Sequence, residues 1–248
     1  MLRDNFIDIA MKLGVDEHLR TLRSTIVPRY RQARVENEHM RKLLRSVLKS
    51  DSHCIDIGAY RGRILGELVR LAPRGRHIAY EPLPHLHKLV HERFPMVDVR
   101  QAAVSDEVGE TIFHYVKSTP AESGLRERSY SVERQIEKLV VRTETLDSCL
   151  PEGYVPTFIK IDVEGAELQV FRGGIEMITR HKPVIIFEHG KGGATYYNTQ
   201  PGDVYSLLAE EIGLSIFDLE GNGPYSKAQF EDAFAEDRRW DYVARPWR

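Results

Sequence analysis

The chain has 248 residues, 42% of them hydrophobic and 29% charged, which is typical of a globular protein with one α/β domain or two small domains. No apolar run approaches the roughly 18 residues that a membrane span needs. The first thirteen residues carry four charges, so we expect no secretory signal. Two cysteines, Cys54 and Cys149, are too few for a disulfide framework, which predicts free thiols and a cytoplasmic location.

The charge distribution argues against nucleic acid as a partner. The net charge is −2, but residues 1–50 hold 11 Lys and Arg against 6 Asp and Glu, while the rest of the chain holds 24 against 31. The acidic balance of residues 51–248 disfavours a nucleic-acid substrate. The basic first segment leaves a weak surface for an anionic partner open.

Residues 1–50 have apolar side chains at helical spacing, which predicts three helices. Gly14 ends the first helix, Asp16 can cap the second and Pro28 interrupts it. We treat residues 1–50 as an N-terminal helical extension and residues 51–248 as one catalytic domain. Three roles are open for the extension: a homodimer interface, a cover over the active site, or packing on the sheet.

From residue 53 onward, short apolar segments alternate with helical patterns. This alternation predicts a mostly parallel sheet with helices on both faces. The predicted strands are Cys54–Ile57, His77–Tyr80, 98–103, 157–161 and 184–187, with helices at 65–71 and 86–94. Further predicted elements are a strand or hairpin at 104–116, a mobile loop at 119–132, a helix at 204–212, and final strands at 214–219 and 240–244.

The strongest candidate site is the turn after the first strand, Asp56-Ile57-Gly58-Ala59-Tyr60-Arg61-Gly62. Glycines at 58 and 62 let the backbone approach a ligand closely, at the strand end where such sheets bind ligands. The spacing is not the dinucleotide fingerprint G-x-G-x-x-G, because the second residue after Gly58 is Tyr60. Asp56 would repel a pyrophosphate, whereas it suits the ammonium and sulfonium of S-adenosylmethionine.

Two further strand ends supply candidate cofactor contacts. Glu81, followed by Pro82, ends the second predicted strand 23 residues after Gly58, where a carboxylate can accept two hydrogen bonds from a ribose diol. Ala103 and Val104 could form one wall of an adenine slot. Ser105 or Asp106 could then bond the exocyclic amine of the base. Each of these acids is also compatible with an ordinary solvated strand end.

The remaining polar candidates follow the fourth and fifth predicted strands. Asp162 and Glu164 end the strand at 157–161, and Glu188 and His189 end the strand at 184–187. Acids packed together at a strand end repel one another, which proteins tolerate mainly at functional sites. Glu167 is weaker as a candidate, because an acid in the first turn of a helix is favoured in any case.

The motifs IDIGAYRG, YEP, AVSD, TLD, FIKIDVEGAE with FRGG, and IIFEHG occur in this order. Together they resemble the FkbM-type S-adenosylmethionine-dependent methyltransferases over residues 51–244. The resemblance implies a seven-stranded Rossmann-like sheet with the last strand antiparallel, and O-methylation of a sugar, polysaccharide or natural-product hydroxyl. It places Asp56, Gly58 and Gly62 on the cofactor turn and Glu81 on the ribose.

Methyl transfer to an alcohol requires alignment of the acceptor oxygen and one general base. Asp162, Glu164, Glu188 and His189 are the candidates, and we favour His189 with Asp162 as an acceptor-side pair. Alternatively, the acids could hold a divalent metal such as Mg²⁺ that orients a diol. Two other functions stay open: a non-catalytic cofactor-binding or regulatory module on the same fold, and a nicotinamide-dependent oxidoreductase, which the missing dinucleotide pattern disfavours.

Overall fold

The computed structural model describes residues 28–130, 133–237 and 239–247, with side chains from residue 35 onward. The chain divides into two compact units, Met1–Leu43 and Leu44–Arg248. Helix α3 (Pro28–Val47) begins at a proline, a residue that is favoured in the first turn because its missing N–H needs no partner there. This helix contains most of the third predicted helix, and the first two predicted helices lie outside the described residues.

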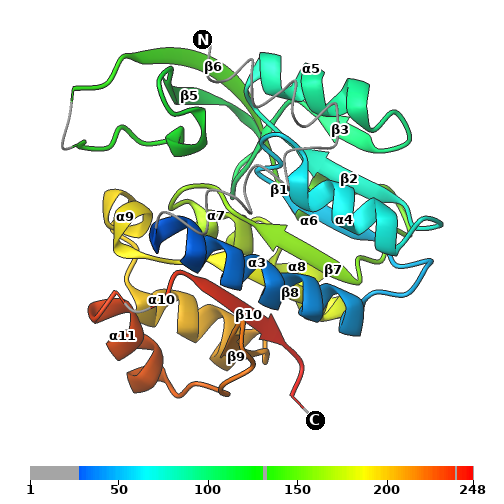
Figure 1. Cartoon of the computed structure of the whole chain (residues 1–248), viewed down its shortest axis with the longest axis vertical. Helices are drawn as coiled ribbons and strands as arrows, with labels where there is room; N and C mark the ends of the chain where they lie inside the picture. The colour runs from blue at the N-terminus through cyan, green and yellow to red at the C-terminus, as the bar shows by residue number, and fades with distance from the viewer. Residues whose placement is uncertain (1–27, 131–132, 238, 248) are drawn as a thin grey trace. The chain divides into compact units, whose positions relative to one another are not determined.

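A seven-stranded sheet forms the centre of the second unit (Figure 1). Its order is β3-β2-β1-β7-β8-β10-β9, and among the described strands of this sheet β10 alone runs in the direction opposite to the others. The strands are β1 (Cys54–Ile57), β2 (His77–Tyr80), β3 (Asp98–Arg100), β7 (Phe158–Ile161), β8 (Val184–Glu188), β9 (Ser215–Asp218) and β10 (Asp241–Arg245). The predicted class I methyltransferase fold, with its antiparallel last strand, is confirmed.

The connections between the strands are helical. They comprise α4 (Arg63–Leu71), α5 (Pro84–Arg93), α6 (Leu146–Cys149), α7 (Glu167–Arg172), α8 (Ile175–His181), α9 (Lys191–Ala194), the 3-10 helix η2 (Thr195–Tyr197), α10 (Pro201–Tyr205) with the π-helical segment η3 (Ser206–Glu211), and α11 (Lys227–Ala235). A capping box between Ser226 and Gln229 fixes the start of α11. None of the helices that the structure describes combines the length and apolar character that crossing a bilayer requires.

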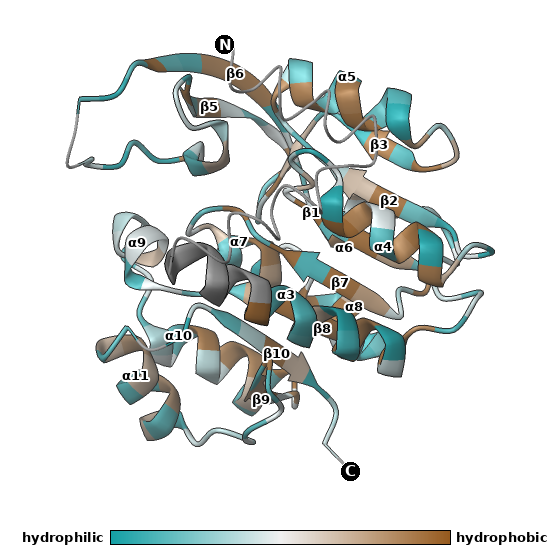
Figure 2. Cartoon of the chain, viewed as in Figure 1, coloured by the Kyte–Doolittle hydropathy of each residue, from teal (hydrophilic) through white to brown (hydrophobic). Residues whose placement is uncertain are grey.

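Both faces of the sheet are buried, because apolar residues alternate sides along the strands. On one face, Ile57 and Ile161 pack with side chains of α7, α8 and α11. On the other face, Ala79 packs with Leu65 of α4 and Val90 of α5. Figure 2 shows hydrophobic residues concentrated on the strands and on the helix surfaces beside them. This packing fixes the carboxyl ends of the parallel strands along one edge.

A second, three-stranded sheet lies between β3 and β7 in the chain. Its order is β4-β6-β5, from strands β4 (Ala103–Val104), β5 (Gly109–Val116) and β6 (Ile136–Glu144). The single strand predicted at 98–103 is therefore wrong. Strand β3 ends at Arg100, whose carbonyl accepts a hydrogen bond from Glu81 N at 3.0 Å, and the chain then enters the second sheet by pairing Ala103 with Thr143.

Arg100 connects the two sheets. Its Nη1 donates to Tyr80 Oη (2.9 Å), Glu144 Oε2 (3.0 Å) and the Cys149 carbonyl (2.8 Å), while Nε and Nη2 bond Asp98. These partners belong to β2, β6, α6 and β3, so one guanidinium ties the small sheet to the large one.

We expect Arg100→Met to lower the free energy of unfolding by about 2–4 kcal/mol, because it leaves the buried Glu144 carboxylate without this partner. Arg142→Met is the matched control, since Arg142 bonds the other oxygen of Glu144 but its side chain is 68% exposed. That loss should stay below about 1 kcal/mol. Urea unfolding of the two variants measures the difference, and equal losses would contradict the role of Arg100.

Candidate active site

The turn after β1 passes so close to β7 that only glycine fits at its first position. Gly58 has φ +75°, and a Cβ there would lie 1.9 Å from the carbonyl oxygen of Asp162. The backbone N–H groups of Gly58 and Ala59 both donate to the Tyr80 carbonyl at 3.0 Å. The turn is thereby fixed between the ends of β2 and β7, at the edge where the parallel strands end.

Gly62 is required for a different reason. It has φ +71°, and a Cβ there would lie 2.6 Å from the ring of Phe94. Ala59 is buried in the same cluster as Phe94. Gly62 and Ala59 therefore shape the turn and the start of α4.

Glu81 lies directly beside this turn. Its Oε2 accepts from Tyr60 N at 2.8 Å and its Oε1 accepts from Leu83 N at 3.0 Å. Each oxygen keeps a second lone pair, so the carboxylate can still accept from a ligand. Burial raises the pKa of Glu81 to about 7, although the two backbone N–H groups favour its charged form.

A cavity opens at this edge of the sheet. Its walls come from the ends of β1, β2, β4 and β7, from β5 and from the segment after β5: Ile57, Gly58, Tyr60, Tyr80, Glu81, Pro82, Leu83, Ala102, Ala103, Val104, Phe113, Pro120, Ala121, Ser123, Leu125, Asp162, Val163, Glu164 and Ala166. Most of this lining is apolar, with carboxylates at 81, 162 and 164. Such a site suits a ligand with an apolar ring, a diol and a cationic group.

Three carboxylates gather at the ends of β7 and β8. Asp162, Glu164 and Glu188 each place one oxygen within 4.8 Å of the other two. Glu164 has a left-handed backbone (φ +59°), a conformation that costs about 1–3 kcal/mol in a non-glycine residue and is concentrated at functional sites. Burial and Asp162 raise the pKa of Glu164 to about 8, and burial with four neighbouring acids raises the pKa of Glu188.

Two cations neutralise part of this cluster. Lys160 Nζ lies 3.1 Å from Asp162 Oδ2, and Arg128 Nη2 lies 2.9 Å from Glu164 Oε2. Among the described residues, no Lys or Arg forms an ion pair with Glu188. Glu188 is therefore the carboxylate of the three that is left without a cation in this part of the chain.

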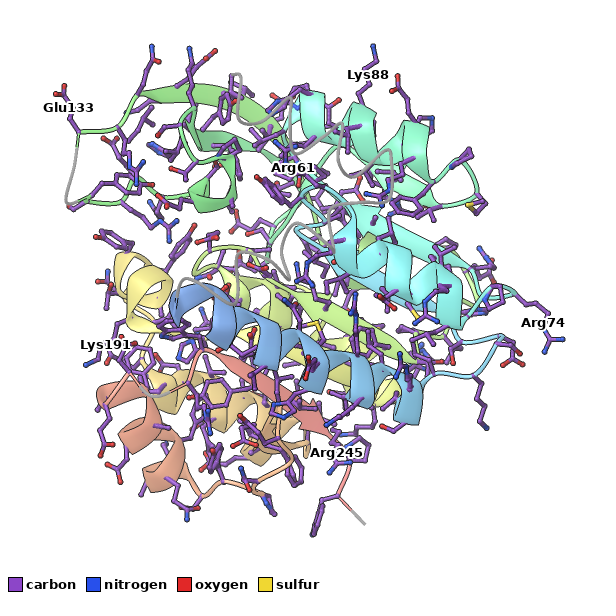
Figure 3. The ribbon with its side chains drawn as sticks, in the orientation of Figure 1. Arg61, Arg74, Lys88, Glu133, Lys191 and Arg245 are labelled. Atoms are coloured by element: carbon purple, nitrogen blue, oxygen red, sulfur yellow. The ribbon has the colours of Figure 1, made fainter. Side chains whose placement is uncertain are left out.

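The segment between β5 and β6 closes one side of the cavity. It contains the 3-10 helix η1 (Pro120–Glu122), and Glu133 projects from its outer end (Figure 3). Arg128 also donates to the Gly192 carbonyl at 3.3 Å, and Tyr196 Oη accepts from Ser129 N at 3.1 Å. These bonds attach the segment to α9 and η2. The mobility predicted for residues 119–132 stays a prediction.

The model of the methyltransferase FkbM domain matches residues 56–213, which is more than half of the chain. The chain belongs to the FkbM methyltransferase family. It thus contains an S-adenosylmethionine-dependent methyltransferase domain, as the sequence motifs predict. No curated protein matches the chain.

Two solved structures are similar to this chain, and the first of them shows the same fold. An FkbM methyltransferase from Methylobacillus flagellatus KT is 16% identical, with a TM-score of 0.50, and the match covers 79% of this chain and 44% of that one. The present chain therefore spans less than half the length of that protein. An O-methyltransferase from Bacillus cereus in complex with SAH is 17% identical, covering 82% of this chain and 76% of that one, with a TM-score of 0.44.

The FkbM fold brings most of the predicted cofactor residues together. Gly58, Tyr60, Glu81 and Pro82 line the cavity, as do Ala103, Val104 and Asp162. Ala59, Gly62 and Ser105 are not among the lining residues; the Ser105 hydroxyl instead donates to Asp106 at 3.1 Å. Asp56 is not a lining residue either: its side chain is 1% exposed and lies 3.7 Å from Lys160, so its placement does not support direct binding of a cationic ligand.

The structure does not support the favoured pairing of His189 with Asp162. The His189 ring is 1% exposed and stacks on Phe230 and Phe234 of α11, at centroid distances of 5.7 and 4.9 Å. It does not line the cavity. Burial lowers the pKa of His189 to about 4, so the ring is neutral at physiological pH. Successive residues of a strand face opposite sides of the sheet, which separates the His189 ring from the side chain of Glu188, its neighbour in sequence.

The contacts of the acid cluster do not fit a resident metal. A divalent cation prefers several free oxygen ligands. Here Asp162 and Glu164 are already paired with Lys160 and Arg128, which a metal would have to displace. The set therefore offers one free carboxylate, at Glu188, and we derive no catalytic step through a metal.

Lys160 and Arg128, which pair with two of the cavity carboxylates, were not predicted from the sequence. A lysine in the middle of the apolar strand Phe158–Ile161 was a detectable signal, because buried lysines need partners. Arg128 carried no such signal, since an arginine in a polar loop is usually solvated. Only the fold shows that the loop returns to Glu164.

Proposed function

We propose that this protein transfers the methyl group of S-adenosylmethionine to a hydroxyl oxygen of a sugar, polysaccharide or hydroxylated natural product. The observation that carries the proposal is the buried Glu81 carboxylate beside the glycine turn, in one cavity with Asp162 and Glu164. Bound there, S-adenosylmethionine would supply an electrophilic methyl group on a sulfonium. The nearby cluster of carboxylates supports an acceptor that carries hydroxyl groups.

The chain's own residues bind and orient the methyl donor and remove the proton of the acceptor hydroxyl. Glu81 accepts from the ribose diol, the apolar wall around Pro82 and Val104 encloses the base, and Asp162 faces the cationic end of the ligand. The segment carrying Arg128 excludes water from the cavity. We assign the general base to Glu188, which does not line the cavity itself but places one oxygen within 4.8 Å of the cavity carboxylates Asp162 and Glu164. Those two are held by cations, whereas the raised pKa of Glu188 suits removal of a hydroxyl proton.

The cofactor part of the proposal is tested by calorimetric titration with S-adenosylhomocysteine at several pH values. We expect micromolar binding, about −8 kcal/mol. The affinity should be full above pH 7 and fall as the pH drops through about 7, because a protonated Glu81 accepts fewer hydrogen bonds from the diol.

The variant Glu81→Gln should bind about 100-fold more weakly and lose this pH dependence. NADH is the control ligand and should not bind. If a folded sample from which any bound ligand has been removed binds neither ligand, the proposal fails, and a regulatory module on the same fold becomes the better reading. Transfer of radiolabelled methyl to a panel of sugars and polyols then tests the acceptor class.

A further inference from the structure

Lys160 is a buried cation in a central strand, and none of the chemical steps above uses it. Its side chain is 9% exposed, between apolar neighbours on β7. Burial lowers its pKa, but Asp162 and Asp56 raise it by more, so the ammonium stays charged. Burying an ammonium costs several kcal/mol unless its partners compensate, so its contacts show what this residue does.

The Lys160 ammonium has three partners. It donates to the Gly58 carbonyl at 2.9 Å, and it lies 3.1 Å from Asp162 Oδ2 and 3.7 Å from Asp56 Oδ1. Gly58 and Asp162 both line the cavity, whereas Asp56 is 1% exposed and lies inside the protein. One ammonium therefore links the glycine turn of β1 to the end of β7 from beneath the cavity.

The two carboxylates beside Lys160 differ in their exposure. Asp56 is enclosed, and burial raises its pKa, a shift that Lys160 opposes and Asp162 increases. The Asp162 side chain is 40% exposed and lines the cavity. Asp162 is therefore the carboxylate partner of Lys160 that a ligand in the cavity can reach. An aspartate so exposed would otherwise sample several rotamers, and the contact with Lys160 restricts it to one.

We propose that Lys160 is a positioning residue for the cofactor, which holds the Asp162 carboxylate and the Gly58 carbonyl where the cationic end of S-adenosylmethionine meets them, and acts chiefly through Asp162. The proposal rests on the proposed function. It predicts that the effects of changing Lys160 and Asp162 on cofactor affinity are not independent.

The test is a double-mutant cycle in a background that protects the fold. Removing Lys160 alone would leave Asp56 buried and unpaired, so every protein carries Asp56→Asn, which makes the buried pair neutral once Lys160→Met is added. The four proteins are Asp56→Asn alone, with Lys160→Met, with Asp162→Asn, and with both. Calorimetry gives Kd for S-adenosylhomocysteine, and thermal unfolding gives Tm for each.

We expect Lys160→Met to weaken binding about tenfold when Asp162 is present and less than about twofold when position 162 is asparagine. Equal fold-changes in both backgrounds, or a lower Tm with unchanged Kd, would overturn the proposal. If the Lys160→Met protein fails to fold, Asp162→Asn in the otherwise native chain decides, since unchanged affinity there removes the residue through which Lys160 acts. Absence of binding in the native protein would instead refute the proposed function.

Discussion

Gly58→Ala is expected to abolish measurable binding of S-adenosylhomocysteine and to destabilise the domain. The new methyl would overlap the Asp162 carbonyl at 1.9 Å, so either the turn or the end of β7 must move. The left-handed φ of +75° adds strain of about 1–3 kcal/mol, and forced repacking adds about 1–3 kcal/mol more. Urea unfolding and calorimetry measure the two effects.

Two other glycines separate the effect of backbone strain from the effect of steric overlap. Gly153 has φ +70°, but the described residues place no atom within 4 Å of the added Cβ, so Gly153→Ala reports backbone strain alone. Gly66 lies inside α4, where the nearest atom would be 3.5 Å away, so Gly66→Ala should stabilise the helix by about 0.5–1 kcal/mol. If Gly58→Ala behaved like Gly153→Ala and kept its affinity for S-adenosylhomocysteine, the close approach of the turn to β7 would not matter for the cofactor.

Glu188→Gln is expected to lower kcat by about 10²–10⁴-fold while leaving the Kd for S-adenosylhomocysteine nearly unchanged. Glutamine keeps the size of the side chain but cannot take the proton of an acceptor hydroxyl. The native enzyme should also lose activity as the pH falls. The raised pKa of Glu188 means that its carboxylate takes up a proton, and can no longer act as a base, at a higher pH than an ordinary glutamate does. The measurement is methyl transfer to an acceptor found in the panel.

The matched control is Glu176→Gln on α8, an exposed acid in the first turn of its helix. It should leave kcat unchanged. The competing candidate is His189, whose replacement by glutamine should affect stability more than kcat, since the ring packs between Phe230 and Phe234. A large loss of kcat in His189→Gln, with Glu188→Gln still active, would return the base role to the histidine.

Local pattern was enough to predict the main sheet. The strands β1, β2, β7 and β8 are short apolar segments that end in polar residues, and helical periodicity separates most of them. The same pattern identified Glu81 and Asp162 as cavity residues. Such predictions succeed because a parallel strand that is buried on both faces appears in the sequence as a short continuous run of apolar residues.

The second sheet was harder to predict because its strands are amphipathic and pair over long loops. Strand β6 mixes charges with exposed apolar residues, and Val140 is 66% exposed, so residues 136–144 gave no clear period. The predicted pairing of His189 with Asp162 lacks support for another reason. Sequence places His189 beside Glu188, but successive residues of a strand face opposite sides, and the rings that it stacks on, Phe230 and Phe234 of α11, are 41 and 45 residues away.

The second sheet supplies a different part of the cavity from the main sheet. Residues 103–144 leave the main sheet after β3 and rejoin it before β7, so they form an insertion rather than part of the central order. This insertion supplies the wall from Phe113 to Leu125 and the Arg128 contact with Glu164, while the glycine turn and Glu81 belong to the main sheet. Changes confined to residues 113–128 would therefore reshape this wall without altering the strand ends that carry the glycine turn and Glu81.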